Sequence, residues 1–408
     1  MTTVRPFQAL RPAPGLAARV ACPPYDVIDA REARALAADS DLSFLYVSRP
    51  EVGLAQGTDE HDPAVYAEGR RALERLTGRG ALVPSAGARY WLYVQERGGR
   101  RQTGLVACVS VDEYDRGVIR KHENTKPDKE DDRTRHIDAL GAHDEPVFLT
   151  YRAEPAVKAL LAPLLANAPA DDFEAEGVRH AVWDVPDAVA PALERAFAER
   201  VPHLYVADGH HRSAAASRVH RQRAGEGGEH GAFLAVLVPD DEVTIMAYHR
   251  LVRDARGRGP DELLREIAAR FDVDDAPGAP EPEAPRSFGF FLGDRWRRAR
   301  VRPGSFDAAD PVASLDCSLV QDQLLGPVFG VADPRRDPNL DFVGGIRGAG
   351  ELERRVRAEG FALGLALYPT AIEELIAVSD RGLLMPPKST WFEPKMRSGL
   401  FVHPFRAP

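Results

Sequence analysis

Short apolar runs that are typical of β-strands alternate with helical segments along much of this chain. Residues 89–96 and 103–114 are strand-like runs separated by Gly98 and Gly99, which predicts a β-hairpin. Further strand-like runs and predicted helices then alternate in the order 145–152, 154–167, 180–185, 187–199, 203–208, 213–225 and 233–241. This alternation favours an α/β (mixed α+β) fold with a mixed or parallel sheet and crossover helices.

The length of 408 residues favours more than one lobe over a single core. Residues 276–286 are proline-rich and acidic, which is typical of an exposed connection. We therefore predict two intimately connected lobes with mixed sheets, residues 1–275 and 287–408. Near the start of the first lobe, residues 29–39 predict a helix and the apolar run 43–50 predicts a buried strand.

Charge and hydropathy exclude several classes of protein. The formal net charge of −9 argues against a nucleic-acid or membrane-surface binder, because such proteins normally carry a basic stripe. No apolar run has a length close to the roughly 20 residues that span a bilayer, and the first residues lack the apolar core of a signal peptide. The three cysteines are widely spaced and form no CxxC pair. We expect a reduced, cytoplasmic, soluble protein, and the oligomeric state stays open.

The sequence Asp-Gly-His-His-Arg at 208–212 lies between an apolar strand and a helix rich in small residues. The free N–H groups and the positive dipole end of that helix can hold an anion. Gly209 lets the backbone approach a ligand closely, and Arg212 can bind phosphate oxygens through both guanidinium nitrogens. Ser213 can cap the helix, and Asp208 can cap it or orient a metal ion. These features favour a phosphate site.

Two other interpretations of the same turn stay open. His210 and His211 can make ordinary hydrogen bonds in a capped turn. They can also bind a metal ion, although adjacent histidines lack the i, i+4 spacing that puts two ligands on one helix face.

A charged stretch at 120–138 contains a second candidate site, Lys-His-Glu-Asn-Thr at 121–125. His122 and Glu123 are candidate acid–base groups, and Lys121 can hold a phosphate or a carboxylate. These residues directly follow a strand-like run, so we expect their side chains to be held in fixed positions. The middle of the stretch is more typical of a solvated face or a mobile loop.

Lysine usage is uneven, because only six of the 53 basic residues are lysines and five of these lie in two short segments. A compact ammonium is not interchangeable with a planar guanidinium, so the retained lysines indicate either a specific need for an ammonium or chance clustering in a small sample. The second segment, 385–395, presents Lys388, Ser389, Thr390 and Lys395 after a double proline that fixes an extended entry. We expect these four residues to bind anionic groups of a substrate.

A short extended segment near the start, ACPPYDVID, adds Tyr25 and Asp26 as candidate substrate contacts. The segment carries little information by itself.

Five ordered motifs together resemble one known family. They are PPYDV at 23–27, SFLYVSRPE at 43–51, KHENT at 121–125, DGHHR at 208–212 and MPPKSTWFEPK at 385–395. The set is similar, nearly end to end, to the bacterial and archaeal domain-of-unknown-function-1015 family, whose name implies no activity.

A more local resemblance concerns the DGHHR turn and its helix, around residues 200–222. This element is similar to the nucleotide-binding motif of the ParB/sulfiredoxin superfamily, which includes free-serine kinases. The resemblance implies that Gly209, His210, His211 and Arg212 hold nucleotide phosphates. By analogy with those kinases, Glu123 is the first candidate for the base toward a substrate hydroxyl, with His122 and Asp208 next.

Three functions follow from these patterns. The first is a small-molecule kinase that transfers phosphate from ATP or ADP, with Mg²⁺, to the hydroxyl of a serine-like substrate. The second is a nucleotide-binding regulatory switch with slow or no hydrolysis, and the third is a metal-dependent hydrolase that uses the histidines. The sequence contains no P-loop, dinucleotide-binding GxGxxG, GxSxG or protein-kinase motif. It does not identify the acceptor, the donor nucleotide or a metal.

Overall fold

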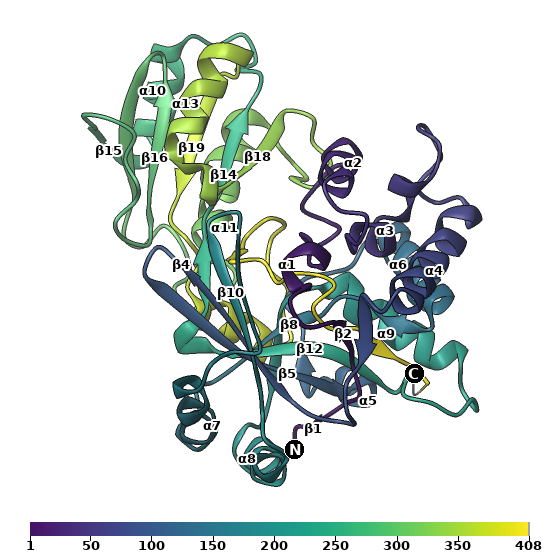
Figure 1. Cartoon of the computed structure of the whole chain (residues 1–408). Helices are drawn as coiled ribbons and strands as arrows, with labels where there is room; N and C mark the ends of the chain where they lie inside the picture. The colour runs from purple at the N-terminus through teal and green to yellow at the C-terminus, as the bar shows by residue number, and fades with distance from the viewer. Residues whose placement is uncertain (407–408) are drawn as a thin grey trace. The chain divides into compact units, whose positions relative to one another are not determined.

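The computed structural model describes residues 1–406, and the chain divides into two units (Figure 1). Unit 1 comprises Met1–Val243 together with Pro394–Pro408, and unit 2 comprises Thr244–Glu393. This division differs from the boundary expected at residues 276–286, because residues 248–252 already pair with strands of unit 2. Within residues 1–406, no helix is long and apolar enough to cross a membrane.

Unit 1 contains a mixed sheet of nine strands, and its strand order is β6-β11-β8-β12-β5-β4-β10-β9, with β1 paired to β5. The strands are β1 (Val4–Arg5), β4 (Trp91–Arg97), β5 (Arg100–Ser110), β6 (Ile119–Arg120), β8 (Val147–Tyr151), β9 (Asp171–Ala175), β10 (Val178–Asp184), β11 (Leu204–Asp208) and β12 (Ala232–Pro239). The pairs β6–β11 and β8–β12 are parallel, and the others are antiparallel. The mixed α+β class is confirmed, and so is the hairpin at Gly98 and Gly99, which both have positive φ.

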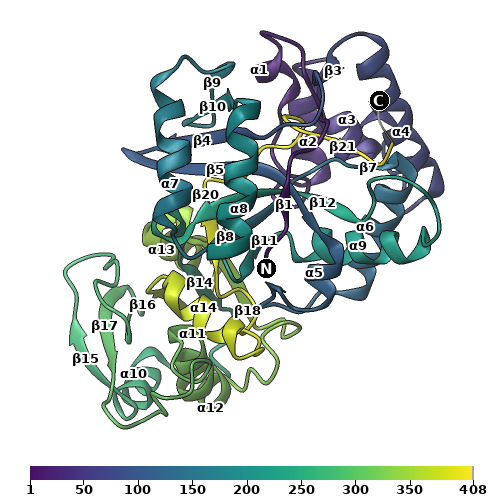
Figure 2. The same ribbon diagram turned by 90° about the horizontal axis from the view of Figure 1, so that it is seen from below.

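The helices of unit 1 form two groups beside this sheet (Figures 1 and 2). They are α1 (Ala17–Val20), α2 (Ala30–Ala38), α3 (Leu45–Ser48), α4 (Pro63–Gly78), α5 (Val111–Asp115), α6 (Pro127–Leu140), α7 (Pro155–Leu161), α8 (Ala190–Arg200) and α9 (His210–Gln222). Helices α7 and α8 pack together and bury Val157 and Phe197 against the sheet. Helix α6 packs between α4 and α9.

Short elements complete unit 1. They are the strand pair β2 (Leu10–Pro12) and β3 (Leu82–Pro84), the strand pair β7 (Ala142–His143) and β21 (His403–Pro404), and 3₁₀ turns at Pro50–Gly53, Ala162–Ala166, Asp187–Val189 and Asp240–Glu242. A second apolar core forms around Phe44, Leu73 and Val402. The returning C-terminal segment is therefore part of the packing of unit 1.

The buried strand expected at residues 43–50 is wrong, because this segment forms α3 and continues into the 3₁₀ turn Pro50–Gly53. An apolar run of this length does not distinguish a buried strand from a buried helix. Here Phe44, Leu45 and Val47 face the second core, and proline at position 50 starts the following turn.

The mobile loop expected as one alternative for the middle of the charged stretch at 120–138 is wrong, whereas the solvated face is present, since Asp128 is exposed. Residues 127–140 form α6, which starts at Pro127 and ends at Gly141 in the left-handed conformation. These are the residues that typically begin and end a helix. Three charged or titratable side chains of α6, Asp132, Arg133 and His136, are buried.

Unit 2 is built on a six-stranded antiparallel sheet in the order β15-β17-β16-β19-β14-β18. Its strands are β13 (Thr244–Met246), β14 (Tyr248–Val252), β15 (Phe271–Asp275), β16 (Ser287–Leu292), β17 (Arg295–Val301), β18 (Leu340–Gly344), β19 (Leu363–Leu367) and β20 (Trp391–Glu393), with β13 and β20 forming a separate pair. Its helices are α10 (Pro260–Ala268), α11 (Asp316–Val320), α12 (Gly326–Phe329), α13 (Gly348–Glu359) and α14 (Ile372–Asp380), with a π-turn at Gln321–Leu325 and a 3₁₀ turn at Gly345–Arg347. Leu352 of α13 packs on Phe291 and Leu251 in the core of unit 2.

Strands β5 and β12 pair so closely at Gly104 that we expect a larger residue there to destabilise the fold. A Cβ at this position would lie 2.2 Å from Cγ1 of Val236, so Gly104→Ala forces the two strands apart. Overpacking of this kind costs about 1–3 kcal/mol, and we expect urea unfolding to show that loss.

The matched control is Gly78→Ala at the end of α4. A Cβ there has nothing within 4 Å, and alanine favours helix, so its unfolding free energy should be equal to or above the wild-type value. Equal stability of both variants would contradict the tight packing at Gly104.

Candidate functional site

The two main candidate motifs follow neighbouring parallel strands of unit 1. Strand β6 pairs with β11 through Leu204 with Ile119 and Tyr205 with Arg120. The carboxyl ends of parallel strands lie at the same edge of a sheet, which is where ligands bind in many α/β folds. The pairing therefore places the residues after β6, including His122, beside those after β11, including His210.

The imidazoles of His122 and His210 are in direct contact at this edge. Their ring centroids are 4.4 Å apart and the rings are nearly perpendicular. Only 2% of His122 and 5% of His210 are exposed, and burial lowers the pKa of both, that of His122 to about 4. Both imidazoles are thus neutral near pH 7.

Helix α9 begins directly after this contact. Gly209 is its N-cap and has φ of +98°, a left-handed conformation that favours glycine. The N–H of Gly209 donates to Oδ1 of Asp208 at 2.8 Å, but the N-cap of α9 has no side-chain cap hydrogen bond, so the helix-capping role expected of Asp208 stays a prediction.

The expected capping role of Ser213 is wrong. Ser213 is fully buried and lies inside α9, where its hydroxyl donates to the carbonyl of His210 at 3.1 Å. A hydroxyl three residues into a helix bonds back to the preceding turn, whereas a cap must precede the first turn.

The carboxylate of Asp208 joins the C-terminal segment to the site. Nζ of Lys395 lies 2.9 Å from Oδ2 of Asp208. Burial by itself raises the pKa of Asp208, but Lys395 and Arg212 outweigh it and hold that pKa below its ordinary value. Lys395, expected to bind substrate, is therefore beside the DGHHR turn.

The other residues of the KHENT segment lie toward solvent. Glu123 is exposed, and Nζ of Lys121 lies 4.6 Å from the centre of the Tyr114 ring. The backbone N–H of Lys126 donates to Nε2 of His211 at 3.1 Å, which ties the loop to α9. His211 therefore has a positioning contact, as expected for a residue of an ordinary turn.

Arg212 points into unit 1, where only 7% of the residue is exposed. Its guanidinium donates to the carbonyl of Pro146 and lies 3.9 Å from Oε2 of Glu145 and 4.0 Å from Oδ1 of Asp208. The guanidinium is not placed for the expected bidentate contact with phosphate, because it is buried and its Nη1 already donates to Pro146, whereas its Nε has no hydrogen-bond partner among the described residues. Arg212 joins the start of α9 to the entry of β8.

Glu145 contacts three segments that are far apart in the sequence, those of Tyr25, Arg212 and Ser398. Its Oε1 accepts a hydrogen bond from the backbone N–H of Tyr25 at 3.1 Å and one from the hydroxyl of Ser398 at 2.7 Å. Burial raises the pKa of Glu145 to about 7. The guanidinium of Arg133 lies 3.9 Å from the centre of the Tyr25 ring, so α6 also contacts this point.

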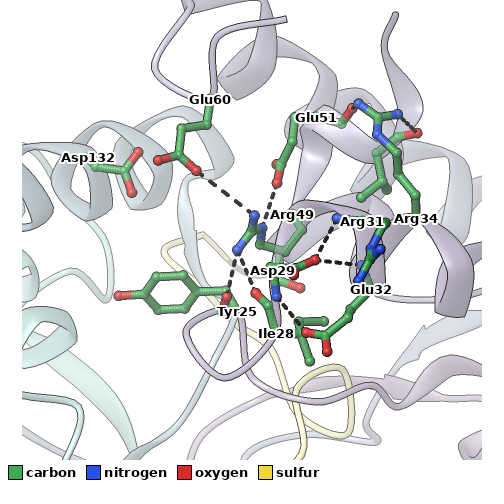
Figure 3. A network of polar contacts seen from close by, with 12 residues as sticks. Tyr25, Ile28, Asp29, Arg31, Glu32, Arg34, Arg49, Glu51, Glu60 and Asp132 are labelled. Atoms are coloured by element: carbon green, nitrogen blue, oxygen red, sulfur yellow. Dashed lines mark hydrogen bonds and ion pairs between the residues drawn. The ribbon is translucent and has the colours of Figure 1, made fainter. Parts of the chain in front are cut away.

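The segment that carries Tyr25 and Asp26 is held by Arg49, the residue that follows α3. Nη1 of Arg49 donates to the carbonyls of Tyr25 and Ile28, and Nε of Arg49 donates to Glu51 (Figure 3). Asp26 is exposed and acts electrostatically on Arg212. The weak ACPPYDVID motif is thus fixed close to the DGHHR turn.

The buried part of this region is too small for a ligand. A cavity of about 10 Å³ lies among residues that include Arg133, Glu145 and Arg212, and such a volume holds about one water molecule.

The remaining candidate residues belong to unit 2. Lys388 has φ of +58°, and its Nζ donates to the hydroxyl of Tyr248 at 3.3 Å. Arg250 donates to the carbonyl of Lys388 at 3.0 Å, and the hydroxyl of Ser389 lies 3.2 Å from Sγ of Cys317. Thr390 follows and is half-buried. These residues form a cluster of their own in unit 2.

Comparison with known proteins identifies the family of this chain. A family described as "Protein of unknown function (DUF1015)" has a sequence model that matches residues 4–318. The chain belongs to this family. A search of curated proteins found no match.

Solved structures that resemble this DUF1015 protein include three of different description. A free serine kinase mutant in complex with ADP has 14% identity and a TM-score of 0.35, and the match covers 72% of this chain and 92% of the other. A conserved hypothetical protein from Pyrococcus furiosus has 12% identity, a TM-score of 0.35 and coverage of 72% and 95%. SbnI with a C-terminal truncation, from Staphylococcus aureus, has 14% identity, a TM-score of 0.36 and coverage of 73% and 87%. At this similarity, activity has to be inferred from the residues of the site.

Sequence reasoning missed two groups that organise the site of this DUF1015 protein. Glu145 was not a candidate, and Arg133 was one charge among many in the 120–138 stretch. One sequence signal was available for Glu145 and was not used. The Asp-Glu-Pro step stands immediately before an apolar strand, where the start of the sheet fixes the side chains.

The buried contacts of Arg212 predict a cost in stability for Arg212→Lys. Lysine keeps the charge but cannot reach Pro146, Glu145 and Asp208 together. Loss of a buried hydrogen bond from a charged donor costs about 1.5–3 kcal/mol, and urea unfolding should show this loss.

The control for this experiment is Arg218→Lys on the same helix, where Arg218 pairs with Glu130 and Asp131 near the surface. We expect its free energy of unfolding to change by less than about 0.5 kcal/mol. Equal stability of the two variants would refute the internal role of Arg212.

The raised pKa of Glu145 predicts a pH dependence of stability. Between about pH 4.5 and 7 the folded state binds this proton more tightly than the unfolded state, so the contribution of Glu145 to stability falls as the pH rises. Each pKa unit is worth about 1.4 kcal/mol. Glu145→Gln should therefore lose less unfolding free energy than wild type between pH 5 and 8.

The control is Glu174→Gln at an exposed position of β9, which should keep the wild-type pH profile. A Glu145→Gln variant with the same pH profile as wild type would contradict the raised pKa.

Proposed function

We propose that unit 1 is a nucleotide-dependent phosphotransferase that acts on the hydroxyl of a small, amino-acid-like substrate. The observation that carries this proposal is the pairing of β6 with β11, which puts the start of α9 beside His122 and the exposed Glu123. Phosphoryl transfer needs positioned cations and dipoles more than covalent chemistry from the protein.

The phosphates would bind at the first turn of α9. Its free N–H groups and positive dipole end favour anions, and the absence of a side chain on Gly209 allows close approach. Lys121 and Lys395 supply ammonium groups from the two segments that flank this turn. Arg212 contributes by holding the turn in place through Pro146 and not by direct contact.

Glu123 is the candidate base toward the substrate hydroxyl, because it is the exposed carboxylate at the end of β6. His122 is neutral and can accept a proton, but it is almost completely buried. Asp208 pairs with Lys395 and already accepts from Gly209, so it is less suited to move a proton.

A divalent cation that arrives with the nucleotide would be held mainly by the phosphate oxygens. Mg²⁺ prefers oxygen ligands, and the carboxylate of Glu123 is the protein group at this edge that suits it. Bound there, it would neutralise charge on the transferred phosphate.

Each unit by itself contains candidate residues for binding a substrate. Tyr25, Asp26 and Lys395 are the polar groups that unit 1 fixes near the DGHHR turn. Lys388, Ser389 and Thr390 of unit 2 are candidates for an anionic group, since Lys388 and the neighbouring Arg250 have no carboxylate partner within residues 1–406.

Two other functions remain alternatives to the phosphotransferase. A nucleotide-binding switch would use the same phosphate contacts without transfer. A metal-dependent hydrolase is favoured by one observation, the cluster of His122, Glu123 and His210.

The proposal is tested by calorimetric titration with ADP and ATP, with and without Mg²⁺, followed by phosphate-transfer assays on serine and related alcohols. We expect Glu123→Gln to keep nucleotide affinity and to lose turnover by at least about a hundredfold, because it deletes the proton acceptor and keeps the size of the side chain.

The matched control is Glu226→Gln, an exposed carboxylate beyond the far end of α9, which should keep both affinity and turnover. Absence of nucleotide binding in wild type would overturn the proposal. Binding without transfer to any alcohol would favour the switch.

A further inference from the structure

We propose that His122, Glu123 and His210 together bind one divalent transition-metal ion of the Zn²⁺ class. This inference names a cation for the same site and rests on the proposed function only for what the ion does during turnover. Binding of the ion itself is independent of any nucleotide.

The geometry of the three side chains supports such a site. One ligand atom from each of His122, Glu123 and His210 lies within 4.8 Å of the other two. Ligands around a tetrahedral Zn²⁺ ion are about 3.4 Å apart, as follows from Zn–N distances near 2.1 Å. Binding of an ion would draw the three ligand atoms closer together, to that spacing. Within residues 1–406, this is the single group of three or more His, Cys, Asp or Glu side chains whose ligand atoms lie within 4.8 Å of one another.

Two buried nitrogens give a second, independent reason. Nδ1 of His122 and Nε2 of His210 are buried and have no hydrogen-bond partner among the described residues. A buried polar atom without a partner carries a free-energy cost, which a ligand that binds the atom can remove. Coordination of a metal ion by both nitrogens removes that cost.

The ring of His122 is also oriented as a metal ligand should be. It hydrogen-bonds to the backbone of Val206 on β11. A histidine that donates one ring N–H to a backbone carbonyl presents its other nitrogen as a lone pair, and metal-bound histidines usually have such a partner. The strand that leads to His210 thus also holds His122.

The donor set determines which ion fits. Two imidazole nitrogens and one carboxylate oxygen suit Zn²⁺, Co²⁺, Mn²⁺ or Fe²⁺, whereas Mg²⁺ and Ca²⁺ prefer sites made of oxygen. Three protein ligands leave at least one coordination position open, as in catalytic zinc sites. Because Glu123 is exposed, that position lies on the side that solvent and a phosphate group can reach.

Surrounding charges are compatible with a cation at this place. Asp208 acts electrostatically on both histidines and favours positive charge beside them, whereas Lys121 opposes it at His210. The ammonium of Lys121 is directed over the Tyr114 ring. A carboxylate that binds metal through one oxygen keeps its second oxygen, so Glu123 can serve both as a ligand and as the proposed base.

The test uses the full-length protein after removal of metals with a chelator and in the absence of nucleotide. Calorimetric titration with Zn²⁺ should give one ion per chain. His122→Gln and His210→Gln should each lower the Zn²⁺ affinity by at least about a hundredfold. Loss of a residue that only supports a metal ligand costs up to about a hundredfold, and loss of a ligand itself should cost at least as much. Glu123→Gln should lower it as well, by a smaller factor.

Titration with Co²⁺ gives a readout that does not depend on the folding of a variant. Wild type should show visible d–d bands of nitrogen and oxygen ligands. A thiolate charge-transfer band would instead place the ion at a cysteine and overturn the proposal.

The control variant is His220→Gln on the same helix, since Nδ1 of His220 already contacts Nδ1 of His230 at 2.9 Å. It should bind Zn²⁺ as wild type does. No Zn²⁺ binding by wild type, or equal affinities in the His122→Gln, His210→Gln and His220→Gln variants, would overturn the site. Unchanged affinity in Glu123→Gln would remove Glu123 from it.

The same measurements separate this inference from the proposed function. Zn²⁺ binding by a protein that binds no nucleotide would refute the phosphotransferase and keep the metal site. Nucleotide binding and phosphate transfer by a protein that binds no Zn²⁺ would refute the metal site and keep the phosphotransferase.

Discussion

The short parallel pairing between β6 and β11 is the constraint on which the candidate site depends. Only Ile119 and Arg120 of β6 take part, yet this pairing brings residue 122 to residue 210 across more than eighty residues of chain. Parallel strands end at the same edge of a sheet, so each loop that follows them starts from a fixed point. The contact of the two imidazoles and the position of Glu123 both follow from that pairing.

Buried charged groups hold the surrounding loops in register. Arg212 ties α9 to the entry of β8, and Glu145 ties that entry to the segments at Tyr25 and Ser398. Removing one partner from such a cluster leaves an uncompensated buried charge, which is strongly destabilising. The cluster therefore holds the backbone beneath the candidate site, and Glu123 lies on the exposed side of it.

Local sequence patterns were sufficient for many elements and insufficient for others. Asp29 followed by Glu32 forms the capping box of α2, and Gly98 and Gly99 form the turn of the first hairpin, so these elements were predictable from a few neighbouring residues. The run at 43–50 was not, because its helix is decided by packing of Phe44 against a core made of distant segments. The charged run at 127–140 became a helix for the same reason, with Ile137 buried against α9.

The sequence by itself determined the mixed α+β class, the strand–turn–helix at DGHHR and the candidate status of His122, Glu123 and His210, because each depends on the type and spacing of nearby residues. Only the tertiary structure decided that Arg212 points inward and that Lys395 meets Asp208. It also decided that the two histidines face each other, each with a ring nitrogen that has no hydrogen-bond partner among residues 1–406. Such contacts join residues far apart in the chain, and the direction of a side chain across them is set by strand pairing and burial, which no local pattern contains.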